Sequence, residues 1–389
     1  MKILIVRTTP NKMNLNTYNL QEIGLAKALI RKGNCCDVMY YCGKEKDHIE
    51  EITFDDGKRK LKILWLHGFG LFYEGIYPSL KKYVKEYDII QVGGYVGITS
   101  VWLNRHLQHK IINYQGPYYC AENKGDIKKA KIWDRLLLPL SHKKNMIVAT
   151  KSILATQYVQ SKGISNVTTI GVGLDLDNLK NDSINENEFI RSLQNKEDKY
   201  LLYVGVLEPR RNILFLLDVF KKVAERIPEC KLVIIGKGKP DYVTSCFEKI
   251  DKLDIKNKII YKESLEQKYV QGVYKLADAF LLPTRYEIFG MVLLEAMYYG
   301  LPVFTTYNGG SSTLMNEQNG VIIPTLNEDV WSNKIVSLLN DKETCKRIGT
   351  AAHFKIANEF TWDALADKFL DVYNKRLLNN SQKVNDFNY

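Results

Sequence analysis

Two acidic residues, Glu287 and Glu295, stand eight positions apart in the most informative stretch of this 389-residue chain. Glu287 lies in a predicted loop after the apolar run 279–282, and Glu295 lies in a predicted helix that opens at Gly290. Carboxylates accept hydrogen bonds from sugar hydroxyls, and a helix N-terminus beyond a strand end favours a phosphate. The stretch therefore indicates a sugar and phosphate site. The alternative is two ordinary surface carboxylates, which is the commoner arrangement for this spacing alone.

A pair of cations forms the second candidate cluster. Gly205 directly follows a predicted strand over 200–204, and Arg210 and Arg211 stand just before a predicted helix over 213–224. A glycine after a strand, with two cations before a helix start, is a reasonable diphosphate site. Ordinary surface charge is the alternative for both arginines.

Alternating strands and helices must position these residues. The chain is too long for one ordinary core, and its βαβ pattern predicts two Rossmann-like α/β domains. We expect domains over 1–180 and 195–361, with the boundary in the polar, Asn-rich segment 178–199. Residues 362–378 are predicted to form the last helix, and residues 379–389 to be disordered.

The central stretch resembles the signature of retaining glycosyltransferases of family 4. The matching elements are Pro283-Thr284, Glu287, Phe289-Gly290, Glu295-Ala296, Gly300 and Pro302-Val303. The resemblance implies the GT-B fold, in which two Rossmann-like domains face an interdomain cleft, with the last helix packing back on the first domain. It also implies transfer of a hexose from a UDP- or GDP-sugar to a hydroxyl acceptor, with retention of configuration at the anomeric carbon. The acceptor would be a glycan or a lipid-linked glycan, as in the biosynthesis of cell-surface polysaccharides or glycolipids.

The same resemblance assigns roles to individual residues. Glu287 would contact the transferred sugar, Arg211 and Arg210 would neutralise the departing diphosphate, and Glu295 would hold the ribose. The remaining donor-site residues are expected to be Gly205, Phe289, Gly290, Gly236 and Lys262. The acceptor and sugar side of the cleft is assigned to Gln115, Tyr18, Asn19 and Gly94.

Three positions depart from the family pattern. The first loop, 14–22, has no glycine pair, Val206 stands where many members carry arginine, and Gln115 stands where many carry histidine. Glutamine can donate to a sugar hydroxyl but cannot take its proton. The glycine-free first loop and Gln115 keep open a catalytically weak partner subunit that only binds the nucleotide sugar, against which the retained Arg211, Glu287 and Glu295 argue. A GT-B-like sugar-nucleotide epimerase is a further alternative, against which the ordered Glu287 and Glu295 pair argues.

Charge is concentrated in the first half of the chain. The whole chain carries a net charge of +11, and residues 1–186 hold 27 Lys and Arg against 18 Asp and Glu, a difference of +9. Basic and apolar residues alternate over 124–144, which indicates either peripheral contact with an anionic membrane or a solvated basic face. No nucleic-acid module is recognisable, so nucleic-acid binding is not expected.

Metal and export signals are not recognised in the sequence. The seven Cys and six His lack metal-ligand spacing, and Asp175 and Asp177 have Asp-x-Asp spacing only within a predicted turn. We therefore expect no metal and no cofactor besides the nucleotide sugar. The first apolar run is too short for a signal peptide and no transmembrane run occurs, so the cytoplasm, or the inner membrane face, is the expected location.

Overall fold

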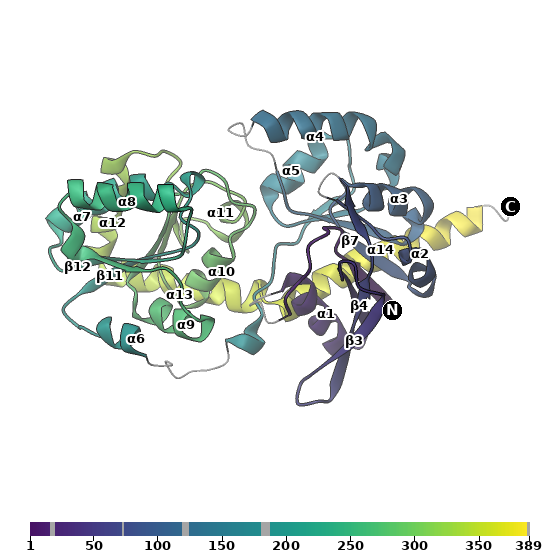
Figure 1. The fold of residues 1–389 in the computed structure, drawn as a ribbon, viewed down its shortest axis with the longest axis horizontal. Coiled ribbons are helices and arrows are strands. Elements are labelled where there is room, and N and C mark those ends of the chain that lie inside the picture. Colours follow the sequence, from purple (N-terminus) through teal and green to yellow (C-terminus); the bar gives the residue numbers. More distant parts are fainter. Residues whose placement is uncertain (16–19, 72–73, 119–123, 180–186, 387–389) are drawn as a thin grey trace. The chain divides into compact units, whose positions relative to one another are not determined.

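The protein is described by a computed structural model that covers residues 1–15, 20–71, 74–118, 124–179 and 187–386 (Figure 1). It forms two compact units, Met1–Asp175 with Thr361–Tyr389, and Leu176–Phe360. The chain thus leaves the first unit just before the polar segment 178–199, and returns to it for its last helix.

The first unit is built on an eight-stranded sheet in the order β10-β9-β8-β7-β1-β2-β4-β3. Only β3 runs antiparallel, in the hairpin with β4. The strands are β1 (Lys2–Val6), β2 (Cys35–Tyr41), β3 (His48–Phe54), β4 (Arg59–Leu66), β7 (Ile89–Gly93), β8 (Ile111–Gln115), β9 (Val148–Thr150) and β10 (Val167–Thr169). A separate small hairpin pairs β5 (Phe69–Leu71) with β6 (Glu74–Ile76).

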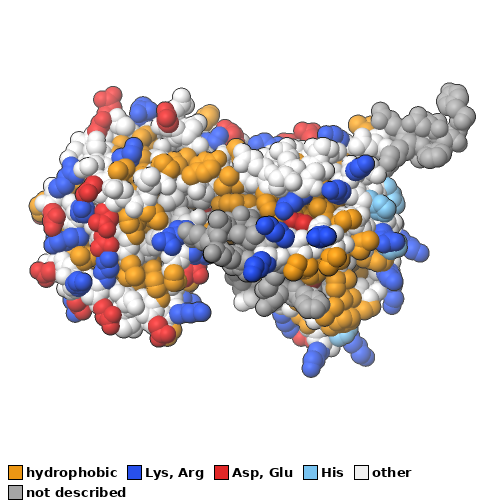
Figure 2. Space-filling model, turned by 90° about the horizontal axis from the view of Figure 1, so that it is seen from above, with side chains coloured by type: hydrophobic (Ala, Val, Ile, Leu, Met, Phe, Trp, Pro, Cys, Tyr) orange, Lys and Arg blue, Asp and Glu red, His pale blue; other side chains and the backbone are white. Residues whose placement is uncertain are grey.

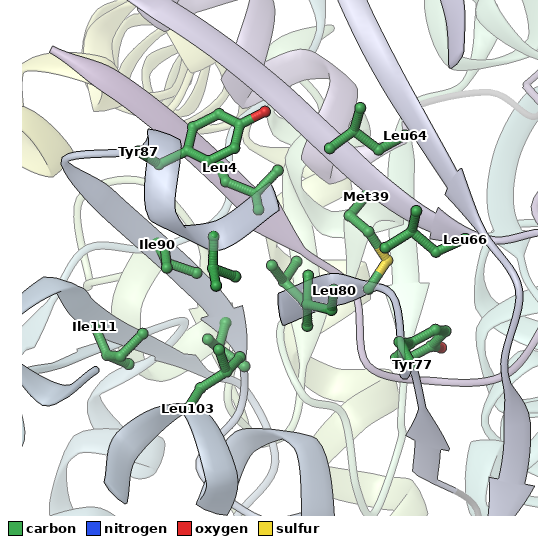
Figure 3. Packing of buried hydrophobic residues seen from close by; sticks show 13 residues of the cluster. Leu4, Met39, Leu64, Leu66, Tyr77, Leu80, Tyr87, Ile90, Leu103 and Ile111 are labelled. Atoms are coloured by element: carbon green, nitrogen blue, oxygen red, sulfur yellow. The ribbon is translucent and has the colours of Figure 1, made fainter. Parts of the chain in front are cut away.

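Helices cover this sheet because its central strands β1, β7 and β8 are buried on both faces, as parallel strands inside a domain are. They are α1 (Gln21–Arg31), α2 (Leu80–Tyr83), α3 (Ile98–His106), α4 (Lys124–Leu136), α5 (Ile153–Ser161) and α14 (Trp362–Asp386). Figure 3 shows Leu80 and Leu103, from α2 and α3, packed against the strand residues Leu4, Met39 and Ile90.

The C-terminal helix α14 completes the first unit. Tyr373 donates a hydrogen bond to the buried Gln91 of β7, and Arg376 Nε donates to the carbonyl oxygen of Ile111 at 3.1 Å. The helix continues to Asp386, so the prediction that it ends at 378 and that 379–386 are disordered is wrong.

The second unit is a doubly wound α/β domain. Its six parallel strands have the order β13-β12-β11-β14-β15-β16. They are β11 (Lys199–Val204), β12 (Cys230–Ile235), β13 (Ile259–Lys262), β14 (Ala279–Leu282), β15 (Val303–Thr305) and β16 (Val321–Ile322). The chain order reverses between β11 and β14, and ligands of such sheets bind beyond the carboxyl ends of the strands at this switch point.

Helices lie on both faces of the second sheet (Figure 1). They are α6 (Glu188–Ser192), α7 (Ile213–Arg226), α8 (Pro240–Lys252), α9 (Gln267–Leu276), α10 (Met291–Tyr298), α11 (Ser311–Leu314), α12 (Glu328–Asn340) and α13 (Lys342–Glu359). Sequence analysis did not predict α13, whose buried residues Ile348, Ala352 and Ile356 form a narrow stripe on a polar helix. Within the described ranges, no helix is both long and apolar enough to cross a membrane.

Candidate active site

Two loops meet at the switch point of the second unit. One follows β11 and runs through the short 3-10 turn η6 (Pro209–Arg211), and the other follows β14 over 283–290. Their strands are neighbours, since Leu201 pairs with Ala279. Because both strands are parallel, the loops leave the same edge of the sheet.

Hydrogen bonds join the two loops into one structure. The Asn212 side chain donates to the carbonyl oxygen of Pro283 at 2.7 Å, and Arg285 N donates to the carbonyl oxygen of Arg210 at 2.8 Å. Thr284 Oγ1 also donates to that Arg210 oxygen at 3.2 Å. Asn212 is buried and has a φ of 55°, a left-handed conformation that asparagine tolerates better than most residues. The loop geometry is therefore fixed by backbone and buried side chains before any ligand binds.

The charged residues predicted from sequence come together here. Arg211 Nη1 forms an ion pair with Glu287 Oε2, and their side chains are only 13% and 12% exposed. Arg210 lies beside them, with Nη1 3.9 Å from Glu287 Oε2 and Nη2 2.7 Å from Glu208 Oε1. Arg211 Nε is buried and has no hydrogen-bond partner among the described residues. The site thus holds a cationic donor group whose hydrogen-bonding capacity is incompletely used.

Gly290 sets the start of α10 beside this pair. Its φ is +80°, and a Cβ atom there would lie 3.0 Å from the Glu287 side chain. Phe289 before it is buried. The loop can therefore turn into the helix directly next to Glu287 only with glycine at this position.

A third loop supports the Glu287 loop from β15. Gly309 N donates to the carbonyl oxygen of Glu287 at 3.0 Å. A Cβ atom on Gly310 would lie 1.8 Å from the carbonyl oxygen of Phe289, so the two backbones touch. The buried Asn308 side chain accepts hydrogen bonds from Gly310 N and Ser311 N at 3.0 and 3.1 Å. Gly309 and Gly310 thus hold the Glu287 loop in place.

Replacing Gly310 with alanine should lower the free energy of unfolding by about 2–3 kcal/mol, because the added methyl group overpacks a backbone contact. Urea unfolding followed by circular dichroism measures this change. Gly93→Ala is the matched control, since the Cβ atom there meets its nearest neighbour at 3.7 Å and should cost little. Equal stability of the two variants would show that the loop contact is not tight.

Glu295 lies on α10 and has different surroundings. Its side chain is buried. Burial raises the pKa of Glu295 to about 7, although interactions with Tyr274 and Gln267 of α9 lower it. The contact between Glu295 and the ribose stays a prediction. The carboxyl group that would make this contact is close to half protonated at neutral pH.

The glycines after β11 and β12 bring a further pair of loops together. A Cβ atom on Gly236 would lie 1.9 Å from the carbonyl oxygen of Gly205, so position 236 requires glycine, and position 205 favours it because its φ is +152°. Beyond them lies a cavity of about 490 Å³. It is lined by Val206, Leu207, Glu208, Pro209, Lys237, Gly238, Lys239, Asp241 and Tyr242. Lys262, predicted to face the base, is not part of this lining, and its ammonium lies 6.0 Å from the Phe189 ring centroid.

The first unit has its own cavity, of about 330 Å³, at the carboxyl ends of β1, β7 and β8. Gly94 and Gln115, both predicted from sequence, line it together, and a Cβ atom on Gly94 would lie 3.2 Å from Gln115 Oε1. Tyr18 and Asn19, assigned to the same side, lie outside the described residues.

Four charged residues that line this cavity were not predicted from the sequence, namely Arg7, Glu22, Glu74 and Lys151. Arg7 and Lys151 directly follow β1 and β9, so the strand-end rule that identified Gly205 would have found them. Glu74 lies in the small β5–β6 hairpin, for which the sequence has no clear pattern. Across the described part of the chain, no three His, Cys, Asp or Glu residues are grouped to hold a metal ion.

Comparison with known proteins shows what this unit is similar to. Residues 185–354, which lie within the second unit, match the family model described as glycosyl transferases group 1. An uncharacterized glycosyltransferase of Methanocaldococcus jannaschii is 31% identical over 189 residues, which are 48% of this chain and 47% of the relative. The chain thus spans about half the length of the curated relatives it matches.

Solved structures define the fold. Sucrose-phosphate synthase from Thermosynechococcus elongatus superposes with a TM-score of 0.71 at 17% identity, covering 96% of this chain and 99% of that one. Anabaena HepE in complex with UDP also gives 0.71, at 15% identity, covering 96% and 100%. The protein therefore has the GT-B fold of two Rossmann-like domains, as the sequence predicted.

Proposed function

We propose that this protein is a retaining glycosyltransferase of the family 4 type, which transfers a hexose from a nucleoside-diphosphate sugar to a hydroxyl acceptor. The observation that carries the proposal is the buried Arg211–Glu287 pair at the switch point of the second unit. Cations at this position suit a diphosphate leaving group, and a carboxylate beside them suits sugar hydroxyls. The match of this unit to glycosyl transferases group 1 supports the same activity.

The geometry suggests how the reaction proceeds. The bond from the anomeric carbon to the diphosphate oxygen breaks, and the acceptor oxygen forms the new bond to that carbon. Arg211, with Arg210 beside it, stabilises the negative charge that develops on the departing diphosphate. The acceptor proton passes to a phosphate oxygen of the leaving group. Glu287 orients the sugar once the donor diphosphate draws Arg211 toward itself. The proposal assigns charge neutralisation to these arginines and no step to a metal ion.

UDP-sugars are the first donors to test. A neighbour with the same fold, Anabaena HepE, has been solved with UDP-glucose, and GDP-sugars are the second choice. Thermal unfolding with UDP, GDP and their sugars, in wild type and Arg211→Ala, identifies the donor because a bound ligand raises the melting temperature. We expect one nucleotide to stabilise wild type and to lose its effect in the variant. A protein stabilised by none of them would contradict the proposal.

Nucleotide release separates the proposed transferase from its two alternatives. A transferase releases the nucleoside diphosphate faster when acceptor extract is added. An epimerase changes the sugar of the donor without releasing nucleotide, and a binding subunit does neither. Either of the last two results, with a stabilising nucleotide, would replace the transferase by that alternative.

We further propose that α4 brings the first unit to an anionic membrane surface, where the enzyme would act on a glycan or lipid-linked acceptor in polysaccharide or glycolipid biosynthesis. Ile132, Leu136 and Leu140 recur at four-residue spacing and are 58%, 62% and 43% exposed. Lys128, Lys131 and Arg135 are exposed beside them. Figure 2, which views the side on which α4 lies in Figure 1, shows apolar side chains among basic ones. Such a face suits peripheral binding from the cytoplasm.

Reversing the charge of Lys128, Lys131 and Arg135 to glutamate should weaken binding to vesicles with anionic lipid by more than about 100-fold, since each basic residue contributes about 1 kcal/mol. Vesicle co-sedimentation at several lipid concentrations measures the affinity. The control reverses three exposed lysines of the second unit, Lys252, Lys256 and Lys334, and so matches the change in net charge. Equal losses in both triple variants would mean that overall charge, and not α4, determines binding.

A further inference from the structure

The cavity of the first unit contains charged groups to which the proposed chemistry assigns no role. Its volume of about 330 Å³ lies at the lower end of the range for small-molecule sites, about 300–1,000 Å³. The lining is rich in hydrogen-bonding side chains from several strand ends. They are Arg7, Thr8, Thr9, Gln21, Glu22, Glu74, Gln91, Tyr114, Gln115 and Lys151.

Lys151 is the least compensated of these groups. Its ammonium donates one hydrogen bond, to Gln21 Oε1 at 2.8 Å, and lies 5.0 Å from the Tyr114 ring centroid. An ammonium has three donors, and among the described residues the other two have no hydrogen-bond acceptor. Burial lowers the pKa of Lys151, and the Arg7 charge lowers it further, while Glu22 raises it. An anion entering the cavity would accept hydrogen bonds from the unused donors of Lys151 and would stabilise its positive charge.

Arg7 is nearby and is only partly neutralised. Its Nη1 lies 2.9 Å from Glu22 Oε1, and its Nε donates to Thr9 Oγ1 at 3.0 Å. Its Nη2 has no hydrogen bond within the described residues. Because Glu22 forms an ion pair with Arg7, Glu74 is the other carboxylate of the lining that could balance the charge of Lys151.

Glu74 does not supply that balance. Its Oε2 is buried without a hydrogen-bond partner among the described residues, and a Cβ atom on Gly97 would lie 2.4 Å from it. Burial raises the pKa of Glu74 to about 7, although a hydrogen bond with Thr8 lowers it. A carboxyl group that is about half protonated at neutral pH repels an anion less than a fully ionised one and can still exchange hydrogen bonds with a hydroxyl group. The cavity therefore combines the two cations Arg7 and Lys151, of which only Arg7 has a carboxylate partner within the described part of the chain, with a polar carboxyl group beside them.

We infer that this cavity binds the phosphate-bearing end of the acceptor, with Lys151 and Arg7 on the phosphate and Glu74 on a neighbouring hydroxyl group. The inference rests on the proposed function in taking this ligand to be the acceptor. A phosphorylated sugar or polyol presents both groups within one small molecule. A lipid headgroup that joins a phosphate to a polyol presents the same chemistry.

Calorimetric titration of the whole protein tests the inference, with glucose 6-phosphate, glucose and inorganic phosphate as probes. We expect glucose 6-phosphate to bind tightest. Lys151→Met should weaken it at least about tenfold and bring it close to glucose, because a charged hydrogen bond is lost. Glu74→Leu should keep phosphate binding but remove the advantage of glucose 6-phosphate over inorganic phosphate. Lys58→Met, at an exposed lysine of the β3–β4 turn, is the control.

Vesicles of phosphatidylinositol distinguish a lipid source from a soluble one. Binding of these vesicles that depends on Lys151, without binding of glucose 6-phosphate, would assign the site to a headgroup. The inference is overturned if neither probe binds, or if Lys151→Met loses no more affinity than Lys58→Met. Titration with UDP and GDP, which concerns Arg211 in the other unit, is run in parallel. Loss of one binding activity without the other shows which of the two proposals has failed.

Discussion

Transfer by the Arg211→Met variant should be about 100- to 1,000-fold slower than by wild type, because the charge that develops on the departing diphosphate loses its closest cation. The same change should lower the free energy of unfolding by about 3 kcal/mol. The loss of stability has a separate cause, because Glu287 is only 12% exposed and its negative charge would have lost its partner Arg211. Release of nucleoside diphosphate from the donor measures the first effect, and urea unfolding measures the second.

The double variant Arg211→Met, Glu287→Gln separates these two effects. Neutralising both partners should restore most of the lost stability, since no unpaired charge remains, and should leave transfer as slow as in the single variant. Arg226→Met, at an exposed arginine of α7, is the matched control and should change neither quantity much. If Arg211→Met kept a tenth or more of wild-type transfer, Arg211 would not be the residue that stabilises the leaving group.

Glu295 should make the protein less stable as the pH rises. Its pKa is about 7 in the folded protein against an ordinary value of 4.5, so the folded state binds more protons between these values. The stabilisation is fully present below pH 4.5 and is lost as the pH rises through 7. A shift of this size corresponds to about 3 kcal/mol, at about 1.4 kcal/mol for each pH unit.

Glu295→Gln tests this by removing the titrating group at nearly constant shape. The variant should be close to wild type at pH 5 and more stable than wild type by about 2–3 kcal/mol at pH 8. Urea unfolding at both pH values gives the difference in the free energy of unfolding between the variant and wild type. The titration of all other groups cancels in this difference. Glu317→Gln, at an exposed glutamate, should show the same difference at both pH values. A pH-independent difference for Glu295→Gln would show that the carboxyl is already ionised at pH 5.

The sequence predicts the strands and the loops at their ends better than the helices that carry few apolar residues. β14 is a short, fully apolar run, and β11 is apolar after Lys199, so the ends of both strands, and with them Glu287 and Arg211, could be located without the structure. Helix α13 was missed because four buried residues among 18 positions, one of them a glycine, give little periodic signal. The end of α14 was missed because its last residues are polar and lack any apolar stripe.

Contacts between distant loops could not be predicted. Asn308 reads as an ordinary turn residue, yet its side chain orders the loop that supports Glu287. Glu74 resembles an ordinary surface carboxylate in the sequence, and only the fold shows it buried beside Gly97. Both depend on which loops come together, which the order of strands in the sheet determines and local spacing does not.

The path of the chain has a consequence for its synthesis. Gln91 and Ile111 are made early, but their partners Tyr373 and Arg376 are made only after the whole second unit. At about 5–20 residues per second, ribosomes need roughly 10–40 s to make the second unit. During this time the first sheet lacks a helix that covers it, while the second unit, which is continuous in sequence, can already fold. The nascent first unit is therefore the part of this protein with most need of chaperones.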